Sequence, residues 1–273
     1  MNNLNYDVVI IGAGMVGGAL ASLLSRSGFS VALVEAREPQ PFDGGAEMGL
    51  RVSAISTGSA NILDQAGAWK ATSAQRVRPY RRMQVEDGVE LEPLLFDAPL
   101  FNLERLGTIV ENNLLQWSLW QVVKSAGLVD VYCPDQLESI EFGNEGNRVS
   151  LKSGKVLQAS LVVGADGAAS RVRKSVGIGQ DHYAYNQHAL VAVVGKQKPN
   201  PGVAWQRFLA GGPLAFLPLK DGRSSIVWTR PSADAQRLLK LDTEAFISAL
   251  DIASSGWLGR VTTCGPRAAF PLS

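Results

Sequence analysis

The 273-residue chain has few cysteines, few histidines and almost no net charge. Its two cysteines, Cys133 and Cys264, lie far apart and outside any CxxC or Cys/His spacing. This argues against a zinc site or a disulfide framework, so no metal ligands are expected, and a reducing, cytoplasmic setting fits best. Lysine and arginine total 26 against 25 for aspartate and glutamate, and the net charge of +1 gives no reason to expect a nucleic-acid partner.

Long hydrophobic runs are also absent from the sequence. The apolar stretch at residues 6–11 is too short to span a bilayer, and no basic segment with a cleavage site surrounds it. Neither a signal peptide nor a transmembrane helix is therefore expected, although peripheral membrane contact stays open. With 46% apolar and 19% charged residues, the chain is long enough to form one large core or two domains.

The first 35 residues have the pattern of a strand, a helix and a second strand. Apolar β-branched residues at 7–11 predict the first strand, and residues 15–27 have helical spacing that ends at Gly28. Residues 30–35, SVALVE, predict a buried second strand that ends in an acid. This order is one βαβ unit.

A glycine motif lies between the first strand and the helix. Gly12, Gly14 and Gly17 form G-x-G-x-x-G, which permits a tight turn and lets the helix N-terminus approach a diphosphate. Glu35 follows Gly17 by 18 residues, where its carboxylate could accept hydrogen bonds from both ribose hydroxyls of an adenosine. The motif predicts a bound dinucleotide but does not distinguish NAD from FAD.

The rest of the chain changes character near residue 179. Helices are expected at 57–66, 112–126 and 243–253, and short strands before residue 179 at 82–85, 137–142, 148–151 and 161–163. Later strand-like segments, separated by proline and glycine, favour an antiparallel sheet and lie at 189–194, 204–209, 214–219 and 224–229. The expected fold class is α/β, a Rossmann-like domain with a second, mainly antiparallel β-sheet domain.

A second motif decides which dinucleotide is bound. Residues 162–173 read VVGADGAASRVR, in which Asp166 and Gly167 end a strand and Ser170 can cap the next helix, while Arg171 and Arg173 could meet phosphates. The alternative is that Asp166 has only a structural role and orders the turn. The segment resembles the DG motif of the flavoprotein aromatic hydroxylases with the para-hydroxybenzoate hydroxylase fold, which implies contact with FAD and NAD(P)H.

Four further stretches narrow the resemblance to the ubiquinone-biosynthesis hydroxylases of the UbiH/UbiF/VisC type. They are LRVSAI at 50–55, IVENN at 109–113, HALVA at 188–192 and GPLAFLPL at 212–219. The resemblance implies that Arg51 reaches the FAD phosphates or adenine and that Asn112 lies against the flavin, although Asn112 could equally be a simple N-cap. The GPLAFLPL segment could line a substrate pocket or belong to the hydrophobic core. His182 and His188 are expected to be structural.

This resemblance implies an FAD-dependent monooxygenase that hydroxylates the aromatic ring of a polyprenylated ubiquinone precursor. The reduced flavin would capture O2 as a C4a-hydroperoxide, NAD(P)H would bind transiently, and few catalytic side chains would be needed, so none is assigned. Other ubiquinone-biosynthesis proteins are possible partners. The alternatives are another flavoprotein of this fold, such as a phenol hydroxylase, halogenase or prenyl reductase, or a catalytically silent scaffold subunit.

The expected domains are discontinuous. An FAD-binding domain is expected at 1–75 and 105–178, and a substrate domain at 76–104 and 179–273. The family carries a third motif, a strand ending in Gly-Asp, downstream of the counterpart of residues 270–272, whereas this sequence stops at Ser273. The chain is therefore expected to be a C-terminally truncated portion that folds but retains little FAD.

Overall fold

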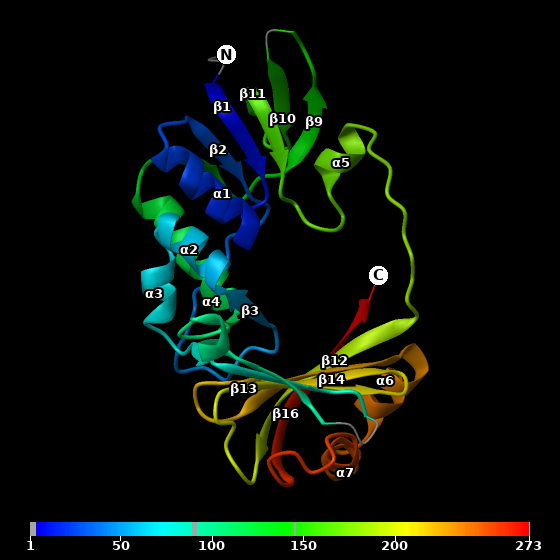
Figure 1. Cartoon of the computed structure of the whole chain (residues 1–273). Coiled ribbons are helices and arrows are strands. Elements are labelled where there is room, and N and C mark those ends of the chain that lie inside the picture. The colour runs from blue at the N-terminus through cyan, green and yellow to red at the C-terminus, as the bar shows by residue number, and fades with distance from the viewer. Residues whose placement is uncertain (1–3, 89–91, 145, 273) are drawn as a thin grey trace. The chain divides into compact units, whose positions relative to one another are not determined.

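Two compact units make up the computed structural model, which describes residues 4–88, 92–144 and 146–272 (Figure 1). The first unit runs to Asp43 and resumes at Gly58–Ala74 and Asn112–Asp181, and the second takes Gly44–Thr57, Gln75–Glu111 and the chain from His182. The expected boundaries differ from these, because they gave 44–57, Gln75 and 105–111 to the first domain and 179–181 to the second. Residues 52–56 pair with 107–111, and 107–109 also pair with 78–80, which joins both long segments to the second unit.

A six-stranded mixed sheet forms the centre of the first unit. Four neighbouring strands are parallel and two at one edge are antiparallel. Val31–Val34, the second strand of the expected βαβ unit, is buried on both faces, as parallel strands covered by helices require. In spatial order the strands are β8 (Val129–Tyr132), β2 (Val31–Val34), β1 (Leu4–Ile11), β11 (Val156–Gly164), β10 (Asn147–Leu151) and β9 (Leu137–Glu141).

Side chains alternate across this sheet and build a core on each face. Val8 and Ile10 of β1 face a cluster that includes Trp120 and Val123, whereas Val9 and Ile11 face the other cluster. No helix in the described ranges is long and apolar enough to cross a bilayer. The helices of this unit are α1 (Met15–Arg26), α3 (Trp69–Ser73), α4 (Asn112–Ser125), α5 (Arg171–Ser175) and nearly all of α2 (Thr57–Gln65).

The second unit is built on a seven-stranded sheet. Its neighbouring strands are antiparallel except β13 and β5, which are parallel, and α6 (Ser232–Lys240) and α7 (Thr243–Ala253) contribute to the core on one face. The expected fold class is confirmed. In spatial order the strands are β16 (Val261–Leu272), β12 (Gln187–Lys196), β15 (Ser224–Pro231), β14 (Gly212–Pro218), β13 (Val203–Leu209), β5 (Arg82–Glu86) and β6 (Leu94–Asp97).

The GPLAFLPL segment is a central strand of this sheet. Leu214 and Phe216 are fully buried in the core that α6 and α7 complete, and Leu217 packs in a separate cluster with Tyr80 and Ile109. Because side chains alternate along a strand, the two groups belong to opposite faces. The segment is therefore core on at least one face.

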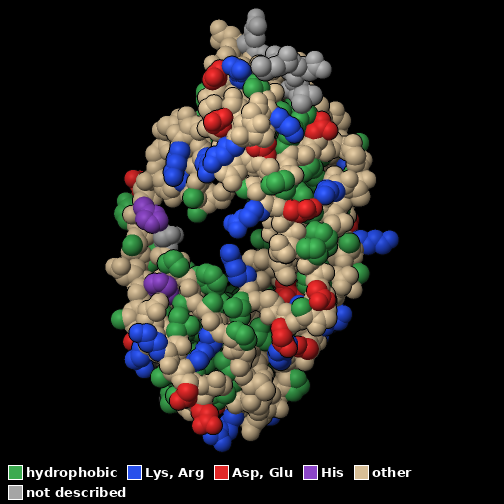
Figure 2. All heavy atoms as spheres, turned by 180° about the vertical axis from the view of Figure 1, so that it is seen from behind, with side chains coloured by type: hydrophobic (Ala, Val, Ile, Leu, Met, Phe, Trp, Pro, Cys, Tyr) green, Lys and Arg blue, Asp and Glu red, His purple; other side chains and the backbone are tan. Residues whose placement is uncertain are grey.

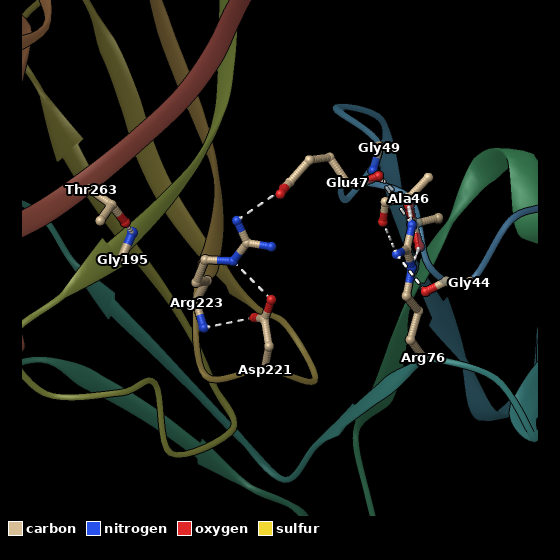
Figure 3. A network of polar contacts seen from close by, with 10 residues as sticks. Gly44, Ala46, Glu47, Gly49, Arg76, Gly195, Asp221, Arg223 and Thr263 are labelled. Carbon is tan, nitrogen blue, oxygen red and sulfur yellow. Dashed lines mark hydrogen bonds and ion pairs between the residues drawn. The ribbon is translucent and has the colours of Figure 1, made fainter.

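A three-stranded sheet completes the second unit and fixes the loop that precedes β3 (Val52–Ser56). It has the order β3, β7 (Gly107–Glu111), β4 (Arg78–Tyr80). Glu111, only 2% exposed, accepts hydrogen bonds from Arg76 Nε at 2.6 Å and from the Gly49 N–H at 2.6 Å. The Arg76 guanidinium also donates to the carbonyls of Gly44, Ala46 and Glu47, as Figure 3 shows.

This buried ion pair predicts unequal effects of two acidic substitutions. Glu111→Ala removes a buried carboxylate that accepts from Arg76 and from the Gly49 N–H, and should lower the free energy of unfolding by about 1.5–3 kcal/mol. Glu47→Ala removes an 87% exposed carboxylate that lies 3.4 Å from Arg223, and should cost less than about 1 kcal/mol. Thermal and urea unfolding of the two variants measure this difference, and equal destabilisation would contradict the role given to Glu111.

Candidate functional site

A cavity of roughly 470 Å³ lies at the carboxyl ends of β1, β2 and β11 in the first unit. Ligands of open parallel α/β sheets bind at this edge. The two sequence motifs, far apart along the chain, meet there because Ile11 pairs with Gly164. The lining residues are Ile11, Gly12, Gly14, Val34, Glu35, Ala36, Gln116, Asp135, Gln136, Leu137, Ala165, Asp166, Gly167, Ala169 and Arg171.

The three motif glycines have different physical reasons to be glycine. Gly12 has a φ of +104°, and a Cβ there would lie 2.4 Å from the Ala165 carbonyl oxygen. A Cβ at Gly17 would lie 1.9 Å from the Gly12 carbonyl oxygen. Gly14, in contrast, has a φ of −67° and no atom within 4 Å of a built Cβ. The chain itself therefore requires Gly12 and Gly17, whereas Gly14 leaves space open at the cavity wall.

That open space lies at the start of α1. Gly14 is the N-cap residue and has no side chain to accept from the first backbone N–H groups, and the first turn contains no acidic residue. The first backbone N–H groups of α1 and the positive end of the helix dipole therefore face the space that Gly14 leaves. This arrangement suits a diphosphate.

Glu35 follows β2 and lines the same cavity. Its Oε2 accepts from the Ala13 N–H at 2.6 Å and its Oε1 from the Arg37 N–H at 3.1 Å. An ionised carboxylate accepts about four hydrogen bonds, so both oxygens keep capacity for a ligand hydroxyl. Glu35 therefore ties the glycine loop to β2 and stays suited to the predicted ribose contact.

Asp166 holds the turn after β11. Its carboxylate accepts from the Ser170 hydroxyl at 2.6 Å and from the N–H groups of Arg171 and Val172, while the Ser170 hydroxyl oxygen accepts from the Arg173 N–H at 3.0 Å. Burial opposes ionisation, but the hydrogen bonds from Ser170, Arg171 and Val172 outweigh it and lower the pKa of Asp166. The side chain thus shapes the cavity wall mainly by capping α5.

The two arginines of the DG-like segment lie differently. Arg171 lines the cavity, and its Nη1 donates to the Leu137 carbonyl oxygen at 3.2 Å. Arg173 donates from Nη2 to the Ala168 carbonyl oxygen at 2.7 Å and is not among the residues that line this cavity. Arg171 is therefore better placed than Arg173 to contact a ligand in the cavity. The cofactor contact expected of Arg173 stays a prediction.

Helix α4 contributes a residue that sequence reasoning missed. Asn112 is its first residue and is half-buried, and its predicted flavin contact stays a prediction. Gln116, four residues on, lines the cavity and donates from Nε2 to the Ala13 carbonyl oxygen at 3.3 Å. Residues four apart lie on one helix face, so the position of Asn112 contained a signal for Gln116.

The other residues considered in the sequence lie in the second unit. Arg51 is exposed, with its guanidinium 5.5 Å from the centre of the Phe270 ring, and its predicted phosphate contact stays a prediction. His188 Nδ1 lies 3.0 Å from Ser232 Oγ, a structural hydrogen bond. His182 is exposed, and both histidines, purple in Figure 2, reach the surface.

Several curated proteins are similar to this chain. The 3-demethoxyubiquinol 3-hydroxylase of Escherichia coli (strain K12) is 37% identical over 273 residues, which cover 100% of this chain and 69% of that protein. The ubiquinone hydroxylase UbiL of Rhodospirillum rubrum is 33% identical, over 98% of this chain and 62% of that protein. The mitochondrial ubiquinone biosynthesis monooxygenase COQ6 of Xenopus tropicalis is 37% identical, over 91% and 56%.

Solved structures show the same fold. PqsL of Pseudomonas aeruginosa matches 96% of this chain and 73% of its own, with a TM-score of 0.76 and 22% identity. The p-nitrophenol 4-monooxygenase PnpA of Pseudomonas putida matches 99% and 69%, with a TM-score of 0.71 and 16% identity. The family model described as FAD binding domain matches residues 5–251. The glycine loop, Glu35 and the turn at Asp166 therefore belong to a member of the FAD binding domain family.

Proposed function

We propose that this chain forms the FAD-binding and substrate-binding part of a monooxygenase that hydroxylates the aromatic ring of a polyprenylated ubiquinone precursor. The observation that carries the proposal is the cavity where the glycine loop, Glu35 and Arg171 meet. The names of the relatives support the choice of reaction, and the chain spans between 56% and 69% of the length of the three relatives described above.

The cavity fits the adenosine and diphosphate part of FAD. The glycine loop and the first N–H groups of α1 would hold the diphosphate, Glu35 would accept from the ribose, and Arg171 would add a positive charge. Bound FAD, once reduced by NAD(P)H, supplies the activation of O2 for transfer of one oxygen atom to the ring. The residues of this chain bind and orient the cofactor through hydrogen bonds that the fold already positions.

Further parts of the proposal concern the second unit and the setting of the enzyme. We assign substrate binding to the second unit, and Arg51, Asn112, Asp166, Gly167 and Arg173 to supporting the cofactor. NAD(P)H would bind transiently, because the dinucleotide motif G-x-G-x-x-G occurs once in this sequence, at Gly12 to Gly17. A cytoplasmic enzyme in peripheral contact with a membrane and with other ubiquinone-biosynthesis proteins would reach a prenylated substrate.

Isotopically labelled O2 tests the proposed reaction. The full-length protein that carries this chain is given FAD, NADH or NADPH and a prenylated phenol, and the product is examined by mass spectrometry. One labelled oxygen atom on the ring is expected. Reduction of the prenyl chain or halogenation would identify a different flavoprotein. FAD binding without any turnover by the full-length protein that carries this chain would favour a scaffold subunit.

Replacement of Gly14 or of Gly17 by alanine distinguishes an effect on cofactor binding from an effect on folding. Gly14→Ala places a Cβ in open space and should lower stability by less than about 1 kcal/mol, the ordinary cost of alanine at an N-cap, while weakening FAD binding about tenfold or more, ~1.4 kcal/mol. Gly17→Ala drives a Cβ into the Gly12 carbonyl and should lower stability by about 1–3 kcal/mol. Thermal denaturation without FAD and fluorescence titration with FAD measure the two effects. Parent-like FAD affinity in Gly14→Ala would show that no ligand occupies this space.

Charge reversal at Glu35 tests the ribose contact. Glu35→Arg removes the acceptor and should weaken FAD binding about tenfold or more, since hydrogen bonds to charged groups contribute about 1.5–3 kcal/mol. The matched control is Glu38→Arg, which reverses an exposed carboxylate that bonds Trp120 and Lys124 and does not line the cavity. Flavin fluorescence titration of the folded variants gives both affinities. Equal affinities would remove Glu35 from the site.

A further inference from the structure

A second cavity, of about 690 Å³, lies wholly within the second unit and is lined by four arginines. It is bordered by β4, β5, the loop before β7 and the start of β13. Four guanidinium groups and two carboxylates line the cavity, so its formal net charge is +2. The whole chain has a net charge of only +1. The charged lining residues are Arg78, Arg81, Arg82, Arg105, Asp97 and Glu104.

The cavity contains positive charge that the protein does not neutralise. Arg82 Nε donates to Asp97 Oδ2 at 2.7 Å, so this pair accounts for one arginine and one acid. Among the described residues, the side chains of Arg78, Arg81 and Arg105 have no hydrogen-bond or ion-pair partner, and the Nε of Arg78 is buried without an acceptor. A buried donor without a partner costs free energy, and an anion in the cavity would supply the missing acceptor.

Backbone hydrogen bonds hold the arginines around the cavity. The Ala98 N–H donates to the Arg81 carbonyl oxygen at 2.9 Å, and the Leu106 N–H donates to the Tyr80 carbonyl oxygen at 3.0 Å. These bonds fix the segments of Arg81 and Arg105 beside each other. Gly202 has a φ of +91°, and a Cβ there would lie 3.4 Å from Arg78 Nη2 and 3.6 Å from its Nε. A larger residue at this position would therefore pack on the Arg78 guanidinium, and glycine adds no side chain over it.

We propose that Arg78, Arg81 and Arg105 bind a phosphate group of an anionic ligand. Guanidinium groups match phosphate oxygens through paired, charge-assisted hydrogen bonds, and three of them exceed the charge that Glu104 can balance. The site is independent of the proposed FAD cavity. A soluble phosphate compound would use the arginines alone. A phospholipid would also contact Leu100, Phe101 and Leu103, which are 76%, 53% and 40% exposed.

Calorimetric titration with pyrophosphate at low ionic strength tests the site. Saturable binding is expected, with affinity at least about tenfold lower in Arg78→Met and in Arg105→Met. Glu104→Gln removes a competing negative charge and should tighten binding about two- to fivefold, which a merely structural role would not do. The control is Arg237→Met in α6, whose side chain is 65% exposed and lies outside this cavity.

Vesicles identify the source of the phosphate. Sedimentation with phosphatidylcholine vesicles that contain phosphatidylglycerol, but not with pure phosphatidylcholine, would support the site and assign it to a lipid headgroup, provided Arg105→Met abolishes it. Pyrophosphate binding without vesicle binding would support it with a soluble ligand. Absence of pyrophosphate binding, or equal affinities in the parent and both arginine variants, would overturn the proposal. FAD titration of the same variants should match the parent, which keeps this test separate from that of the FAD cavity.

Discussion

The close approach of three backbone segments at Gly12, Gly17 and Ala165 determines the geometry of the nucleotide cavity. The Gly12 carbonyl oxygen occupies the place that a side chain at Gly17 would take, and the Ala165 carbonyl leaves no room for one at Gly12. Helix α1 can therefore begin directly on the end of β1 and beside the end of β11. One cavity is consequently lined by the N-terminal donors of α1, by Glu35 and by the turn at Asp166. Loss of the close backbone approach would move these three groups apart.

Sequence patterns predicted the first unit well because its elements are local and strongly patterned. The glycine motif, the fully apolar β2 and Glu35 lie within 35 residues, and the order of strand, helix and strand is as predicted, whereas their ligand contacts stay predictions. Gln116 and Arg171 were harder to assign, since a helix face and a guanidinium direction depend on tertiary packing. The flavin-side roles of Arg51, Asn112 and Arg173 came from family resemblance and stay predictions.

The second unit was less predictable, for physical reasons. Strand β16 contains Thr262, Thr263, Gly265 and Pro266, so it lacks the apolar alternation of a half-buried strand, and its pairing with β12 shifts register twice. The strands β3, β4 and β7 are at most five residues long and gain stability from one another. The buried Arg76–Glu111 pair that fixes the loop before β3 joins residues 35 apart and has no sequence signature.

The discontinuous composition of the units has a consequence for how the chain acquires its structure. Strands β1 and β2 lie within the first 34 residues and can pair early, but Leu4 pairs with Leu157, so the pairing of β1 with β11 must wait for more than 120 further residues to be synthesised. Until then the β11 edge of β1 is unpaired, and closing so long a loop is entropically costly before any contact compensates for it. The arrangement that brings two remote motifs to one cavity therefore makes folding of the first unit slow, and exposes its central strand to misassociation in the nascent chain.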